Sequence, residues 1–152
     1  MTLPRTAATA ISHLFSGTPF HIILYVTSVC NARCEYCYYA EELNKDTKYE
    51  LTDDEIVSVF QGLQGVPHLS ISGGEPFLRK DFIGIARKLI NRKNLTSINI
   101  VTNGILKERI LKVARFILDN DKTNTRLLIC VSLDGFEERH DHIRRVPGSF
   151  KK

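Results

Sequence analysis

Three cysteines stand close together in the first quarter of the chain. Cys30, Cys34 and Cys37 fall within eight consecutive residues and form the pattern C-x3-C-x2-C. Three thiolates can bind three irons of a cubane cluster and leave the fourth iron open to another ligand. A structural zinc site is the main alternative, but it needs four protein ligands. The remaining cysteine, Cys130, lies within an expected strand as a small core or cavity-lining residue, so the spacing favours an iron–sulfur cluster.

A glycine-rich turn is the second candidate for chemistry. Its sequence is Ser72-Gly73-Gly74-Glu75-Pro76. Paired glycines let the backbone approach a ligand closely, and a carboxylate complements an ammonium group. A tight turn between a strand and a helix is the other interpretation, because Gly-Gly and Pro also make such a turn.

Polar residues also follow two later apolar runs, at Asn103-Gly104 and at Ser132 to Gly135. Asn103, Ser132 and Asp134 are candidate ligand contacts, although Asn-Gly and Asp-Gly also supply the positive φ of ordinary turns. The segment His140-Asp141-His142 follows a run of charged residues, so we expect an exposed helix face there rather than a second metal site.

Short β-branched runs alternate with segments of helical period, which predicts βαβ units and a parallel sheet. Thr52 and Glu55 form a capping box that predicts the start of the first helix. Ligands bind outside the carboxyl ends of such strands, where the cysteines and glycines would lie. We expect strands at His21–Val29, His68–Ser72, Ser97–Thr102 and Arg126–Leu133, and further helices over 81–91 and 106–120.

The two faces of the expected sheet differ in polarity. Residues of one phase are polar or aromatic, including Tyr25, Ser70, Asn99 and Cys130. The other phase is apolar and includes Leu127, Ile129, Val131 and Leu133. A flat sheet covered on both faces would be apolar throughout, so this pattern favours a curved sheet, a partial (β/α) barrel with outer helices.

Composition narrows the class of protein. The chain has 152 residues and a formal net charge of +4, with basic residues interleaved with acids, which argues against nucleic acid as a partner. We expect one soluble core domain over residues 20–152, preceded by an N-terminal arm over residues 1–19, with no membrane association. Clustered cysteines without a secretion signal indicate metal ligation in the reducing cytoplasm.

The motifs taken together resemble those of the radical S-adenosylmethionine (SAM) superfamily, in the branch with peptide-modifying and molybdopterin-pathway members. The resemblance rests on C-x3-C-x-aromatic-C after the first strand and on Gly73-Gly74-Glu75-Pro76 after the second. It implies a 4Fe–4S cluster on Cys30, Cys34 and Cys37, which are also the catalytic residues. That cluster would reductively cleave SAM to a 5′-deoxyadenosyl radical, which abstracts hydrogen from a substrate.

The resemblance also implies a set of cofactor contacts and partners. Tyr36 would lie near the adenine, the residues from Gly73 to Pro76 would bind the SAM amino group through their backbone and Glu75, and Asn103, Ser132 and Asp134 would add further contacts. The electron donor would be a flavodoxin or ferredoxin. The substrate stays open between a peptide or protein and a small molecule. An iron–sulfur electron carrier or scaffold without SAM chemistry is the alternative function.

The resembling region contains about four of the family's six βα units, so we expect a truncated core that is weakly active alone. The fourth strand would present an exposed apolar edge, which is a site for pairing with another chain. The helix expected after Phe136 has little room before Pro147 and would leave the outer face of this strand poorly covered.

Overall fold

The structure is a computed structural model that describes residues 17, 19–63, 65–92 and 94–152. Of the expected N-terminal arm, residues 1–19, it describes only Gly17 and Pro19, so that expectation lies outside the described residues. Among the residues described, no helix is both long and apolar enough to cross a membrane.

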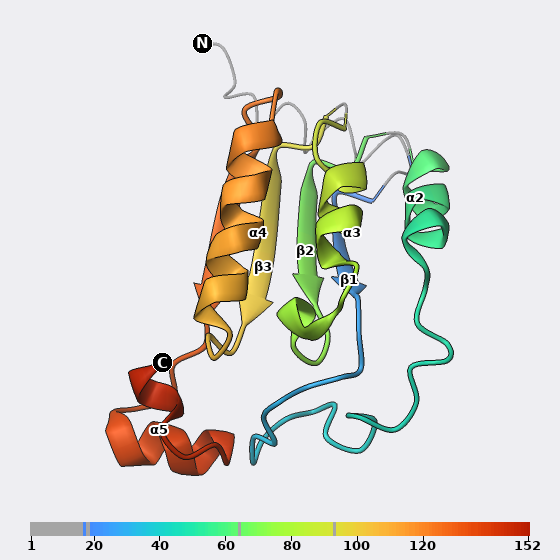
Figure 1. Cartoon of the computed structure of the whole chain (residues 1–152). Coiled ribbons are helices and arrows are strands. Elements are labelled where there is room, and N and C mark those ends of the chain that lie inside the picture. Colours follow the sequence, from blue (N-terminus) through green and yellow to red (C-terminus); the bar gives the residue numbers. More distant parts are fainter. Residues whose placement is uncertain (1–16, 18, 64, 93) are drawn as a thin grey trace.

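Four parallel strands form one sheet in the order β1-β2-β3-β4 (Figure 1). All four expected strands are confirmed, although β1 and β4 end earlier than predicted. From Thr27 onward the chain bonds to Glu50 and to the turn after β2, so it leaves the regular ladder before Cys30. The strands are β1 (His21–Tyr25), β2 (His68–Ser72), β3 (Ser97–Thr102) and β4 (Arg126–Val131).

In the residues that the structure describes, three helices cover one face of the sheet, and a fourth lies beyond the carboxyl ends of the strands (Figure 1). The capping box is confirmed, because Thr52 and Glu55 each accept a hydrogen bond from the other's backbone N–H. The covering helices are α2 (Asp53–Gln61), α3 (Phe82–Leu89) and α4 (Lys107–Asn120), the last helix is α5 (Glu137–Arg144), and two short 3-10 turns are η1 (Pro76–Leu78) and η2 (Ser149–Lys151).

The predicted difference between the two sheet faces is confirmed. Under the helices the strands bury apolar side chains such as Leu69, Ile71, Ile98 and Ile100. In the described part of the chain no helix covers the opposite face, where Tyr25 is exposed beside polar neighbours. This open sheet, with an apolar covered face and an open face that carries polar and aromatic side chains together with the exposed Ile23 and Leu128, is the partial barrel that the alternation predicted.

The chain from β4 onward agrees with one expectation and differs from two others. Val131 and Leu133, on the apolar face that was expected to be poorly covered, are 59% and 69% exposed. Cys130 is exposed rather than a core residue. The helix after Phe136, for which little room was expected, does form as α5, but it lies beyond the carboxyl ends of the strands and leaves β4 poorly covered, as expected.

The exposed edge of β4 generates a prediction about association. Its unpaired backbone groups and the exposed Leu128 and Val131 form a template for another strand. We expect the 152-residue chain to self-associate with increasing concentration in sedimentation, and Val131→Lys to return it to a monomer. Leu118→Lys, a matched change at an exposed position of α4, should leave association unchanged. A wild-type chain that is monomeric at all concentrations would contradict this expectation.

Candidate functional site

The candidate site lies at the carboxyl ends of the strands. The register pairs Tyr25 with Ser72 and Thr102 with Val131, so the strands end at nearly the same level. The cysteine loop follows β1, the glycine turn follows β2, and the segments around Asn103 and Ser132 follow β3 and β4. This edge is where parallel α/β proteins bind ligands.

The cysteine loop is fixed on one side by Asn44. Its side-chain amide accepts a hydrogen bond from the backbone N–H of Cys30 at 3.0 Å and donates to the Cys30 carbonyl at 3.1 Å. The backbone N–H of Asn44 donates to the carbonyl of Ser28, and its φ of 61° is one that Asn tolerates better than most residues. The first cysteine is therefore held at both of its backbone groups.

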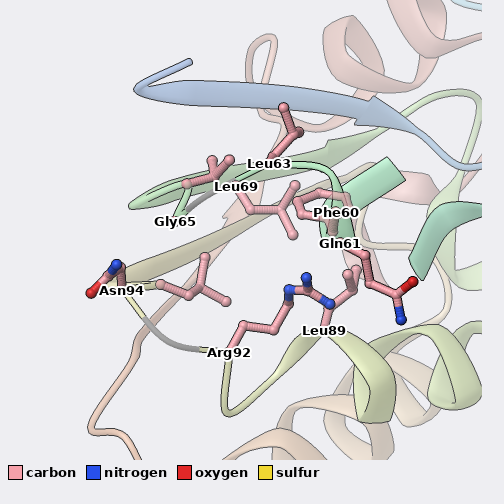
Figure 2. A pocket seen from close by; sticks show the side chains of 10 residues that line it. Phe60, Gln61, Leu63, Gly65, Leu69, Leu89, Arg92 and Asn94 are labelled. Atoms are coloured by element: carbon pink, nitrogen blue, oxygen red, sulfur yellow. The ribbon is translucent and has the colours of Figure 1, made fainter. Parts of the chain in front are cut away.

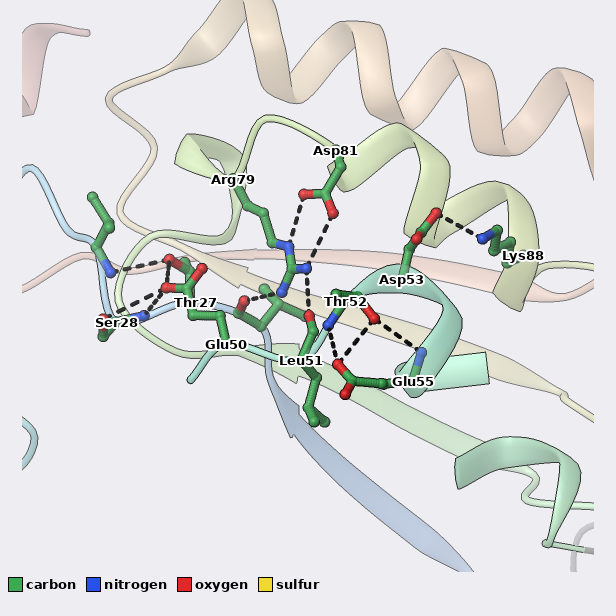
Figure 3. A network of polar contacts seen from close by, with 12 residues as sticks. Thr27, Ser28, Glu50, Leu51, Thr52, Asp53, Glu55, Arg79, Asp81 and Lys88 are labelled. Atoms are coloured by element: carbon green, nitrogen blue, oxygen red, sulfur yellow. Dashed lines mark hydrogen bonds and ion pairs between the residues drawn. The ribbon is translucent and has the colours of Figure 1, made fainter. Parts of the chain in front are cut away.

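A polar network anchors the start of the same loop (Figure 3). Glu50 accepts hydrogen bonds from the hydroxyl of Thr27 at 2.6 Å and the backbone N–H of Ser28 at 2.9 Å. The buried guanidinium of Arg79 donates to the carbonyls of Val26 and Leu51. These bonds satisfy backbone groups that the end of β1 would otherwise leave without partners.

The glycine turn packs directly against the cysteine loop. The backbone N–H of Gly74 donates to the carbonyl of Thr27 at 2.7 Å, and that of Glu75 donates to Val29 at 2.8 Å. A Cβ at Gly73 would lie 2.4 Å from the Thr27 oxygen, and one at Gly74 would lie 2.3 Å from the Val29 oxygen. Gly73 also has a φ of +130°. Both positions need glycine because two backbones meet there.

Glu75 lies behind the cavity wall rather than on it. Its side chain is fully buried, at 0% exposure. One carboxylate oxygen accepts from the Phe77 backbone N–H and the Thr102 hydroxyl, and the other accepts from the Asn103 backbone N–H at 2.8 Å. Burial raises the pKa of Glu75, and these hydrogen bonds act in the opposite direction. The carboxylate thus joins the glycine turn to the end of β3.

Helix α5 holds the cysteine loop from the other side. Its last carbonyls, at Ile143 and Arg144, accept hydrogen bonds from the backbone N–H groups of Glu35 and Arg33. The Arg144 side chain forms an ion pair with Asp134 and donates to the Cys34 sulfur at 3.4 Å. A helix C-terminus therefore supports two loop amides and brings a cation to a thiol.

The expectation of an exposed charged face at 140–142 was wrong for two of the three residues. His140 is 3% exposed, and its Nδ1 accepts a hydrogen bond from the Asp134 backbone N–H. Asp141 accepts hydrogen bonds from the backbone N–H groups of Gly148 and Phe150 and from the Ser149 hydroxyl, which fastens the following chain to α5. His142 is exposed as expected.

A cavity of about 140 Å³ lies between these supports. It brings together most of the residues predicted from the sequence. Glu75 and Pro76 are buried outside its wall, whereas Tyr36 and Asp134 line an adjoining open hollow with Cys34, Cys37, Ser132 and Arg144. The cavity is lined by Cys30, Cys34, Cys37, Gly73, Gly74, Asn103 and Ser132, together with Ala32, Leu43, Ser72, Val101, Thr102 and Arg144.

Tyr36 and Asp134 are themselves in contact. The tyrosine hydroxyl donates to Asp134, and this bond raises the pKa of Tyr36. Its ring is largely exposed, which leaves a face free in the hollow beside the cysteines.

The three thiols suit a cluster better than a single ion. No three Cys, His, Asp or Glu side chains of the described residues converge closely enough to hold one metal ion. A cubane instead takes each thiolate at a different iron. Burial raises the pKa of Cys30, while the Ala32 backbone N–H partly offsets this effect. Its proton must leave when a metal binds.

Another hollow, of about 440 Å³, lies at the amino end of the sheet (Figure 2). Leu63, Leu69 and Leu89 line it, and the Arg92 guanidinium lies over the Phe60 ring. It contains no thiol or carboxylate, and it is distant from the residues described above. We therefore assign the candidate site to the carboxyl end.

The sequence interpretation missed Asn44 and Arg144. Both residues are separated in sequence from the cysteine that they contact: Asn44 lies 14 positions from Cys30, and Arg144 lies 110 positions from Cys34. Arg144 lies one helical turn after His140 and Asp141, so the three side chains share one side of α5. This spacing was the one feature of the sequence that could have indicated that α5 contacts the rest of the site.

Comparison with known proteins agrees with this site. Residues 24–152 match the family model of the radical SAM superfamily. The chain is 33% identical over 133 residues to a GTP 3',8-cyclase of Haemophilus influenzae. The aligned region covers 84% of this chain and 37% of that relative. A GTP 3',8-cyclase of Alkaliphilus oremlandii is 36% identical over 100 residues, covering 63% of this chain and 31% of the relative.

A solved structure shows the same fold. Streptococcus suis SuiB bound to S-adenosylmethionine aligns with a TM-score of 0.69 at 18% sequence identity, covering 97% of this chain and 33% of SuiB. The chain therefore spans about a third of the length of these relatives.

The close approach of the two loops predicts that Gly74 cannot be replaced. Gly74→Ala should lower the free energy of unfolding by about 1–3 kcal/mol, because its methyl group would displace the backbone at Val29 and Cys30. Denaturant unfolding measures this loss. Gly62→Ala is the control, since its Cβ would meet only ordinary contact at 3.7 Å. Equal losses in both variants would contradict the steric argument.

The buried carboxylate yields a second prediction. In Glu75→Gln the amide nitrogen replaces an acceptor oxygen, so a buried donor of the turn or of β3 loses its partner. We expect a loss of about 1–3 kcal/mol in unfolding free energy. The exposed Glu41→Gln should have no effect. Unfolding midpoints for Glu75→Gln equal to wild type would show that the three hydrogen bonds do not stabilise the fold.

Proposed function

Since this chain belongs to the radical SAM superfamily, we propose that it binds a 4Fe–4S cluster through Cys30, Cys34 and Cys37 and cleaves SAM reductively. The observation that carries the proposal is that these three thiols share one cavity with the backbone of Gly73 and Gly74. An electron carrier needs ligands for its cluster but no adjoining site for a small molecule. The backbone of Gly73 and Gly74 instead leaves space beside the thiols, in which a second ligand such as SAM could bind. When bound, the cluster supplies the electron that splits SAM into methionine and a 5′-deoxyadenosyl radical.

The chain's own residues bind and orient these groups. We assign the SAM amino group to the partly exposed backbone of Gly73 and Gly74, with Glu75 fixing the turn from behind through its bonds to Phe77 and Asn103. Asn103 and Ser132, which follow β3 and β4, add polar groups to the wall of the same cavity. Asn103 also donates to the side chain of Asn31 at 2.7 Å, which connects this wall to the cysteine loop.

Tyr36 and Asp134 contribute on the outer side of the site. We propose that the free face of the Tyr36 ring receives the adenine, because the ring borders the hollow that adjoins Cys34 and Cys37. Asp134 holds the tyrosine hydroxyl and so sets the direction of the ring.

The substrate is proposed to enter over the open face of the sheet. The exposed side chains of Tyr25 and Tyr38 lie on this approach, with the Tyr38 hydroxyl donating to that of Tyr25 at 2.6 Å. The candidate substrates are a peptide or protein and a nucleotide-like or other small molecule. The nucleotide-like candidate is supported by relatives that are named GTP 3',8-cyclases. A flavodoxin or ferredoxin is the proposed electron donor.

The cysteine assignment is tested by anaerobic reconstitution. The wild-type chain should take up about four irons, as expected for a cubane with three thiolate ligands. Cys34→Ala should lose the cluster and its absorbance, whereas Cys130→Ala, at an exposed position on β4, should retain both. A full cluster in Cys34→Ala would refute the ligand set.

The SAM assignment is tested separately by calorimetric titration of the reconstituted protein. SAM should bind to wild type, and Glu75→Gln should weaken binding while the iron content stays near wild type. A reconstituted wild-type chain with full iron and no SAM binding would favour the electron carrier instead.

A further inference from the structure

The guanidinium of Arg144 is in direct contact with one of the three thiols. Its Nη1 lies 3.4 Å from the sulfur of Cys34, and its side chain is only 12% exposed. A hydrogen bond to a ligand sulfur and a nearby positive charge are among the groups that set the reduction potential of an iron–sulfur cluster. Low exposure limits the screening of this charge by water.

The position of the guanidinium is fixed by several independent contacts. Asp134 forms an ion pair with its Nε, and the backbone N–H of Asp134 is in turn bonded to the buried His140. The carbonyls of Ile143 and Arg144 accept hydrogen bonds from the loop amides of Glu35 and Arg33 at 3.0 and 3.2 Å. Helix α5 and the cysteine loop are therefore joined by backbone hydrogen bonds as well as by the Arg144 side chain, which lies beside the sulfur.

Two charges act on Cys34 with opposite sign. Arg144 favours negative charge on the cluster, and reduction adds one electron and hence one negative charge. Asp134 partly neutralises that effect through its ion pair with the guanidinium, with 17% of its side chain exposed. Arg145, the next residue, is 61% exposed and lies 3.9 Å from Glu35, so water and a carboxylate screen its charge.

We propose that Arg144 is a positioning residue that raises the reduction potential of the cluster, with Asp134 opposing it. The proposal rests on the proposed cluster at Cys30, Cys34 and Cys37. Substitutions that remove these two charges should shift the reduction potential in opposite directions. A purely structural role for α5 does not predict such opposite shifts.

The test is a potentiometric titration of the reconstituted full chain, followed by electron paramagnetic resonance. At a fixed potential, Arg144→Gln should lower the ratio of reduced to oxidised cluster about tenfold, equivalent to 59 mV for a one-electron couple. Asp134→Asn should raise this ratio, because the guanidinium loses its counter-charge. Arg144→Lys should lie between wild type and Arg144→Gln, and the control Arg145→Gln should match wild type.

The outcomes separate this proposal from the one it rests on. A wild-type chain that takes up no cluster refutes the proposed function. With a cluster present, an unchanged potential in Arg144→Gln overturns the role of Arg144. If Arg144→Gln retains no cluster, the Asp134→Asn variant provides the test. A ratio of reduced to oxidised cluster higher than in wild type supports the proposal, and an equal or lower ratio overturns it.

Discussion

The close approach of two backbones is the constraint on which the rest of the site depends. The Gly73-Gly74 turn lies against residues 27–30, with its amides bonded to the carbonyls of Thr27 and Val29. Nothing larger than hydrogen fits at either Cα. This contact sets the distance between the cysteine loop and the end of β2, and it forms one wall of the cavity. The polar supports around Glu50, Glu75 and Asn44 each hold a part of these two loops.

The fold and the centre of the site could be predicted because their signals are local. Alternation within five or six residues located all four strands, and the Thr52–Glu55 pair located the start of α2. The cysteine spacing and the Gly-Gly pair are likewise contained in short segments. The parallel order of the sheet then places the ends of all strands together, so the convergence of Cys30, Gly73, Asn103 and Ser132 follows from topology.

The features of the site that the sequence did not predict depend on contacts between residues that are far apart in sequence. Nothing near Glu75 indicates that its carboxylate is enclosed by Thr102 and Asn103 instead of facing a ligand. The charges of α5 suggested a solvated helix, because a sequence does not show that Asp134 and the cysteine loop fill its surroundings.

The contact between α5 and the cysteine loop has a consequence for biosynthesis. Cys34 leaves the ribosome 110 residues ahead of Arg144, so the nascent chain carries its three thiols well before the helix that supports them exists. During that interval the loop amides of Arg33 and Glu35 lack the carbonyls of Arg144 and Ile143, which are their partners in the folded chain. The cysteine loop therefore gains its full set of backbone hydrogen bonds only after α5 has been synthesised and has docked against it.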